Sequence, residues 1–114
     1  MSGITSHVLD TSVGKPGAGI DVVLELNDGG ASTEWKTIGT GTTNDDGRVP
    51  GLTSETIAAG HYRINFHVGP YFEKKNTKSF YPIVRIEFIV DDPEQHYHVP
   101  LLLNPFGYST YRGS

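Results

Sequence analysis

Apolar and polar residues alternate one by one in several short stretches of this sequence, and this alternation constrains the fold more than any other feature. It runs from Ile20 to Leu26, from Tyr62 to Val68 and from Val84 to Val90. Successive side chains of a β-strand point to opposite faces, so a period of two indicates strands with one buried and one solvated face. The sequence therefore predicts an all-β protein.

Turn-forming residues separate these stretches from further candidate strands. Asn44-Asp45-Asp46-Gly47 predicts a tight turn, because an Asp-Gly pair readily adopts the positive φ that such turns require. One short helix is expected at 53–59, where Thr53 or Ser54 can cap its start and Gly60 can end it. The expected strands are 6–10, 20–26, 35–43, 62–68, 84–90, 96–103 and 108–114. Seven or eight strands at this spacing predict that residues 1–114 form a single two-sheet β-sandwich domain.

Some of these strands carry apolar residues on both faces. Val23, Ile83, Ile89 and Leu102 stand at positions where an antiparallel sheet of a monomer would present polar side chains to water. Packing between subunits explains this excess apolar surface. We therefore expect an oligomer.

Composition excludes several functional classes. With 9 Lys and Arg against 13 Asp and Glu, the net charge is −4, which argues against a nucleic-acid partner that needs a basic field. No apolar run approaches the roughly 20 residues of a membrane span, so no membrane partner is expected. The absence of Cys excludes disulfides, thiolate metal sites and a cysteine nucleophile. The sequence starts without a basic and apolar leader, so a cytoplasmic location is expected.

Five histidines are more than packing requires in a chain of this size. His96 and His98 share one face of a strand, about 6.5 to 7 Å apart by strand rise. They are either solvent-facing histidines on an edge strand or a metal-binding pair that needs a third ligand such as His7. His61 and His67 alternate with a clearly apolar face, so we interpret them as outward-facing and structural.

Two further features have both an ordinary and a functional interpretation. Arg48 follows the predicted turn and is either a solvated surface charge or a clamp for a planar anion, which a guanidinium binds through two parallel hydrogen bonds. The C-terminal residues 108–114 are either a frayed tail or a last strand that holds the final four residues in place. No nucleophile elbow, phosphate loop or dinucleotide fingerprint is present.

Four motifs, in order along the chain, resemble the transthyretin-like family and specifically its 5-hydroxyisourate hydrolases. They are residues 6–10 (SHVLD), 43–48 (TNDDGR), 96–103 (HYHVPLLL) and 108–114 (YSTYRGS). The last motif is the most specific, because the hydrolases end in Tyr-Arg-Gly-Ser and the hormone carriers of the family do not. The resemblance covers essentially the whole chain.

The resemblance implies a transthyretin-like (prealbumin-like) sandwich of eight strands and a homotetramer, a dimer of dimers, with active sites where the dimers meet. It implies cofactor-free hydrolysis of 5-hydroxyisourate to 2-oxo-4-hydroxy-4-carboxy-5-ureidoimidazoline in urate degradation. Carried over residue by residue, it implies catalytic roles for His7, Arg48, His98 and Ser114. It implies substrate contacts by His7, Arg48, Tyr111, Arg112 and Gly113. No metal ligand is implied. Some family members carry a signal that targets them to the periplasm or to the peroxisome.

These residue types suit the implied chemistry, because hydrolysis of a strained lactam needs an activated water and a stabilised oxyanion. A histidine is a natural base near neutral pH, but the sequence leaves open whether His7 or His98 takes this role. Two other functions remain in competition. One is a transthyretin-type carrier of thyroid hormone without enzymatic activity, and the other is a zinc hydrolase that uses His96, His98 and His7.

Overall fold

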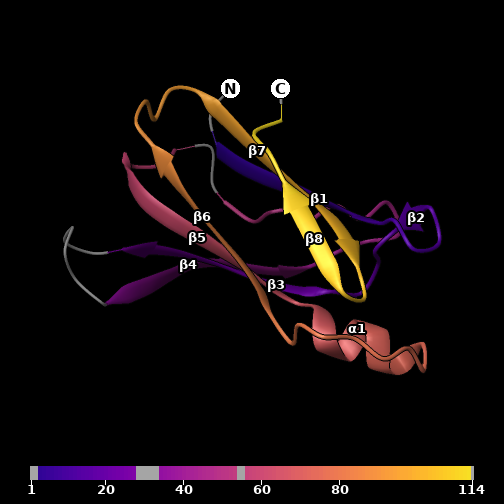
Figure 1. Ribbon diagram of the computed structural model, residues 1–114. Coiled ribbons are helices and arrows are strands. Elements are labelled where there is room, and N and C mark those ends of the chain that lie inside the picture. Colours follow the sequence, from indigo (N-terminus) through magenta and orange to yellow (C-terminus); the bar gives the residue numbers. More distant parts are fainter. Residues whose placement is uncertain (1–2, 28–33, 54–55, 114) are drawn as a thin grey trace.

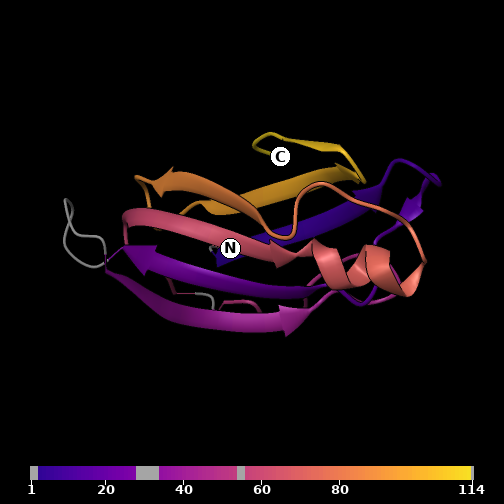
Figure 2. The ribbon, with the colours of Figure 1, turned by 60° about the horizontal axis from the view of Figure 1, so that its bottom comes forward.

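Eight strands in the described part of the chain form two four-stranded sheets that pack face to face (Figures 1 and 2). The computed structural model describes residues 3–27, 34–53 and 56–113. The first sheet has the order β2-β1-β7-β8 and consists of β2 (Lys15–Pro16), β1 (Gly3–Asp10), β7 (His96–Asn104) and β8 (Gly107–Thr110). The second has the order β4-β3-β5-β6 and consists of β4 (Trp35–Thr42), β3 (Asp21–Asn27), β5 (Gly60–His67) and β6 (Val84–Val90). The predicted all-β, two-sheet sandwich is confirmed.

The core lies between the sheets and takes the apolar face of each alternating strand. On β5, the side chains of Tyr62, Ile64 and Phe66 are at most 1% exposed. On β7, Tyr97 and Val99 are buried, whereas His96 and His98, which alternate with them, are half-buried on the opposite face. The period of two that predicts these strands therefore also separates the core from the outer face of the first sheet.

Strand β1 pairs with β7 in parallel, whereas the other strand pairs are antiparallel. The register sets Thr5 opposite His98 and His7 opposite Pro100. This pairing brings His7 on β1 close to His96 and His98 on β7, although the two strands are far apart in the sequence.

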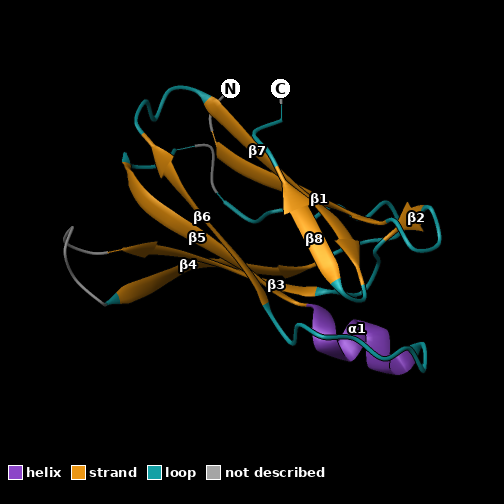
Figure 3. Cartoon of the chain, in the orientation of Figure 1, coloured by secondary structure: helices purple, strands orange, loops and turns teal. Residues whose placement is uncertain are grey.

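The helix was expected in the wrong place. Residues 56–59 contain no helix, and residues 54 and 55 lie outside the described part. Thr53 instead binds β1, because its Oγ1 accepts a hydrogen bond of 3.0 Å from the backbone N–H of Ile4. The short helix α1 (Val68–Lys74) follows β5 directly (Figure 3). The sequence suggests the end of a strand here, because Gly69 and Pro70 usually interrupt regular secondary structure. Proline is nevertheless tolerated in the first turn of a helix.

The C-terminal strand is shorter than expected. Strand β8 ends at Thr110, and residues 111 and 112 belong to no strand. Gly113 then forms an isolated antiparallel bridge with His98, and Ser114 lies outside the described residues. In the described ranges, no helix is long and apolar enough to cross a membrane.

Candidate functional site

The outer face of the first sheet carries a cluster of histidines around one threonine. The Oγ1 atom of Thr5 lies 2.9 Å from Nε2 of His96 and 2.8 Å from Nδ1 of His98. Parallel pairing of β1 with β7 produces this arrangement, because it sets Thr5 opposite His98. Strand β8 pairs with β7 only from Leu101 to Asn104, and an isolated bridge links His98 to Gly113. The two histidines are half-buried, so they are not simply solvent-facing.

The turn before Arg48 places this residue beside His7. The predicted turn is present: the Asn44 side chain accepts hydrogen bonds from the backbone of Asp46 and Arg48. Gly47 has a φ of 76°, and a Cβ at this position would collide with the carbonyl oxygen of Val8. Arg48 then forms an isolated antiparallel bridge with His7. The turn therefore fixes the backbone of Arg48 against β1, while its side chain remains exposed.

The C-terminal segment reaches the same cluster through Gly113. Its backbone N–H donates a hydrogen bond of 2.8 Å to the carbonyl oxygen of His98. A Cβ at Gly113 would lie 2.6 Å from Cδ2 of His98, so the glycine lets the backbone pass directly against the imidazole ring. We call this group the histidine site. It comprises Thr5, His7, Arg48, His96, His98 and Gly113.

Electrostatics at the histidine site favour a neutral His98. Burial lowers the pKa of the His98 imidazole below its usual value of 6.5, and electrostatic interactions with Arg48, His7 and His96 lower this pKa further. A histidine with a lowered pKa is uncharged at neutral pH. It then has one ring nitrogen that donates a hydrogen bond and one that accepts.

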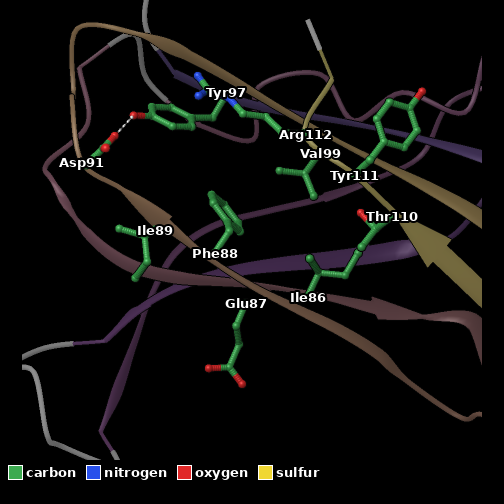
Figure 4. Close-up of a pocket in the computed structure, with 10 residues that line it drawn as sticks. All are labelled: Ile86, Glu87, Phe88, Ile89, Asp91, Tyr97, Val99, Thr110, Tyr111 and Arg112. Atoms are coloured by element: carbon green, nitrogen blue, oxygen red, sulfur yellow. Dashed lines mark hydrogen bonds between the residues drawn. The ribbon is translucent and has the colours of Figure 1, made fainter.

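Among the described residues, the Tyr111 and Arg112 side chains make no hydrogen bond to the rings of the histidine site. The guanidinium of Arg112 lies 4.4 Å from the ring centre of Tyr97 and donates hydrogen bonds to the Gln95 side chain and the His96 carbonyl. The Tyr111 side chain is 59% exposed. Both residues line a different, open cavity of about 340 Å³, together with residues of β6 and β7 (Figure 4).

The other candidate arrangements do not come together. His61 lies on the second sheet, where its Nε2 is 2.8 Å from Oε1 of Glu87 and its ring makes an edge contact with Trp35. His67 ends β5 on the same sheet. Among the described residues, no three His, Asp or Glu side chains are grouped so that they could hold a metal ion. The proposed zinc site of His96, His98 and His7 therefore has no suitable geometry.

Sequence reasoning missed Thr5, which holds two of the histidines. The signal that could have found it is its spacing. Thr5 precedes His7 by two residues in a strand, so both side chains lie on one face.

Comparison with known proteins identifies the family of the chain. The sequence profile of the HIUase/Transthyretin family matches residues 4–113. The chain belongs to this family. It is 47% identical over 112 residues to a 5-hydroxyisourate hydrolase of Salmonella dublin, and the match covers 97% of this chain and 80% of the relative.

Two solved structures extend the comparison to the fold. The structure of Klebsiella pneumoniae 5-hydroxyisourate hydrolase aligns with a TM-score of 0.84 and 32% identity, covering 97% of this chain and 98% of that one. Sea bream transthyretin in complex with thyroxine aligns with a TM-score of 0.89 and 27% identity, covering 96% and 93%. The expected transthyretin-like fold, the family resemblance and the expectation of an enzyme are confirmed.

Proposed function

We propose that this protein hydrolyses 5-hydroxyisourate to 2-oxo-4-hydroxy-4-carboxy-5-ureidoimidazoline in urate degradation. The observation that carries the proposal is the histidine site, where backbone bridges set Arg48 against His7 and Gly113 against His98, an imidazole whose pKa burial lowers. Each of these residues belongs to one of the four motifs that resemble the 5-hydroxyisourate hydrolases of the family. The hydrolase names of the Salmonella and Klebsiella relatives support the choice of substrate.

The proposed reaction divides its work among these residues. Arg48 holds the planar, urate-like ring, because its exposed guanidinium offers parallel hydrogen-bond donors to a delocalised anion. A histidine takes a proton as water attacks the lactam carbonyl carbon. The carbon–nitrogen bond then breaks, the proton passes to the departing nitrogen, and hydrogen-bond donors of the site stabilise the transient oxyanion.

The carrier hypothesis uses the same fold, so the fold cannot separate the two functions. Sea bream transthyretin is similar in structure and is titled as a thyroxine complex. A hormone channel would be apolar, whereas the histidine site presents imidazole rings beside an exposed guanidinium. The polar character of this face therefore favours hydrolysis over transport.

The proposed assembly is a homotetramer whose histidine sites lie between dimers. Large exposed apolar side chains support association: Phe80 is 69% exposed, and Ile89 and Phe106 are each 62% exposed. Isolated exposed apolar residues are ordinary, but several on one small chain indicate surfaces that a partner covers.

A coupled assay tests the proposed reaction. The protein is added to urate and urate oxidase, and the absorbance of 5-hydroxyisourate is followed. We expect this absorbance to disappear faster than in the spontaneous reaction, with full activity after chelation. An unchanged rate together with micromolar binding of thyroxine would reverse the choice between enzyme and carrier. Stoichiometric zinc and loss of activity on chelation would support the zinc hydrolase instead.

A further inference from the structure

One hydroxyl group connects the two imidazole rings of His96 and His98. Thr5 Oγ1 is within hydrogen-bond distance of Nε2 of His96 and Nδ1 of His98, at 2.9 and 2.8 Å. A hydroxyl carries a single proton, so it can donate to only one of these nitrogens and must accept from the other. If both rings are neutral, only two proton arrangements satisfy both contacts.

In the first arrangement, the proton of each ring is on Nε2. His96 Nε2–H donates to Thr5 Oγ1, and the Thr5 hydroxyl donates to Nδ1 of His98. In the second arrangement, both rings carry the proton on Nδ1. His98 Nδ1–H then donates to Thr5, and the Thr5 hydroxyl donates to Nε2 of His96.

The surroundings of His96 favour the first arrangement. Its Nδ1 atom is buried without a hydrogen-bond partner in the described structure. A proton on this atom would create a buried N–H without an acceptor, which is rare in proteins because the desolvated donor lowers stability. In addition, Nε2–H is the more stable tautomer of a neutral histidine in water. Both effects place the protons of His96 and His98 on Nε2.

The position of the His98 ring leaves Nε2 as its functional atom. Thr5 occupies Nδ1, and Gly113 packs against Cδ2. No other described residue makes a hydrogen bond with Nε2, and the His7 ring makes no hydrogen bond within the described residues. The His7 ring nitrogens therefore have no partner among these residues, whereas in the first arrangement His98 has an N–H at Nε2.

We propose that Thr5 is a positioning residue that fixes His98 as a hydrogen-bond donor at Nε2 and leaves His7 as the general base. This inference rests on the proposed function. His7 takes a proton from the water molecule as the water oxygen bonds to the lactam carbon. The Nε2–H of His98 donates a hydrogen bond to the lactam carbonyl oxygen, which becomes an oxyanion. When the carbon–nitrogen bond breaks, the protonated His7 returns its proton to the departing nitrogen.

Nitrogen NMR tests the proton arrangement without reference to activity. Long-range ¹H–¹⁵N spectra of histidine-labelled protein distinguish the two tautomers, and the variant His96→Gln assigns the signals. We expect Nε2–H on both His96 and His98 in the wild type and in Thr5→Ser, with the fixed tautomer of His98 lost in Thr5→Val. A proton on Nδ1 of His98 in the wild type would overturn the inference, whether or not the protein is a hydrolase.

Kinetics test the assignment of roles once wild-type hydrolysis has been established. Thr5→Val keeps the shape of the side chain but removes its hydroxyl. We expect kcat/KM to fall about 10-fold or more, because an incorrect histidine tautomer lowers the rate of other hydrolases. Thr5→Ser keeps a hydroxyl and should retain the activity. A glutamine amide can donate in place of Nε2–H but cannot act as a base. His98→Gln should therefore retain at least 10-fold more activity than His98→Ala, and His7→Gln should be as inactive as His7→Ala. The opposite pattern would make His98 the base.

Discussion

Gly113 packs directly against the imidazole of His98, and the contact leaves no room for a side chain. A Cβ on this residue would lie 2.6 Å from Cδ2 and 3.2 Å from Cγ of the ring. Gly113 also bonds to the backbone of the same histidine. The glycine of the terminal motif thus determines where the ring stands, independently of any contact with substrate.

The variant Gly113→Ala should displace the His98 ring by a few tenths of an ångström or more. Small errors in the position of a reacting group are costly, and about 1 Å can lower a rate roughly 100-fold. We expect kcat/KM for 5-hydroxyisourate to fall 10- to 100-fold with an unchanged melting temperature. Gly107→Ala is the matched control, because its Cβ would have ordinary contacts of 3.9 and 4.0 Å. Equal activity of the two variants would contradict the positioning role.

The lowered pKa of His98 predicts a response to pH. Because the unfolded chain protonates this ring at the higher pKa, the contribution of His98 to the free energy of unfolding decreases as pH falls below 6.5. Arg48→Ala removes one of the positive charges that lower the pKa. We expect the pKa of His98 to rise in this variant but to stay below 6.5, because burial remains. An NMR titration of the ring measures the shift, and Lys36→Ala on β4 should leave it unchanged.

Single residues of the site could be predicted only where a motif marked them. His7, Arg48 and His98 stand in motifs, and the structure brings them together. Thr5 carries no such mark, because its role depends on the pairing of β1 with β7, whose sequences are about 90 positions apart. Tyr111 and Arg112 were expected at the substrate, but their side chains line another cavity. Their contact with substrate stays a prediction.

At the scale of elements, α1 is held to the first sheet by one buried hydrogen bond. The hydroxyl of Tyr71 donates to Oδ2 of Asp10 at 2.7 Å, and both residues are buried. The other carboxylate oxygen of Asp10 accepts from the backbone and side chain of Ser12. Burial and the carboxylate together raise the pKa of Tyr71, so this phenol remains a donor throughout the physiological range.

Tyr71→Phe removes the donor while keeping the aromatic ring in the core. It leaves a buried carboxylate oxygen without this partner, and we expect the free energy of unfolding to decrease by roughly 1–3 kcal/mol. Urea denaturation measures the change. Tyr81→Phe is the control, because this side chain is 37% exposed and should change stability little. Since α1 lies outside the histidine site, a large loss of specific activity in folded Tyr71→Phe protein would show a coupling that the contacts do not predict.

The sequence predicts the strands well and the helix poorly, for one physical reason. A strand with one buried face shows its period over several residues, as Tyr62, Ile64 and Phe66 do. The helix has only seven residues, and its buried face consists of Val68, Tyr71 and Phe72. This spacing of three and four is too short to stand out beside Gly69 and Pro70. Tertiary contacts, including the bond from Tyr71 to Asp10, define this helix more than local propensity does.

At the scale of the whole molecule, two strand edges are open on the same side of the sandwich. Strands β6 and β8 are the ends of their sheets, and residues of both line the cavity of about 340 Å³ (Figure 4). Ile89 on β6 and Tyr111 after β8 are 62% and 59% exposed. Unpaired edges with apolar side chains are aggregation-prone unless another chain covers them. This side is therefore where we expect the first contact of the proposed tetramer.

Sedimentation at low micromolar concentration should give about four times the chain mass of 12.4 kDa. Ile89→Glu places a charge in the proposed contact, so we expect monomers or dimers in sedimentation and an unchanged circular dichroism spectrum. Thr40→Glu introduces the same charge on an exposed position of β4, the opposite edge strand of the same sheet, and should remain tetrameric. If the histidine sites need the assembly, Ile89→Glu should also lose hydrolase activity, and activity should return at protein concentrations that restore the tetramer. A fully active monomer would show instead that one chain completes its own site.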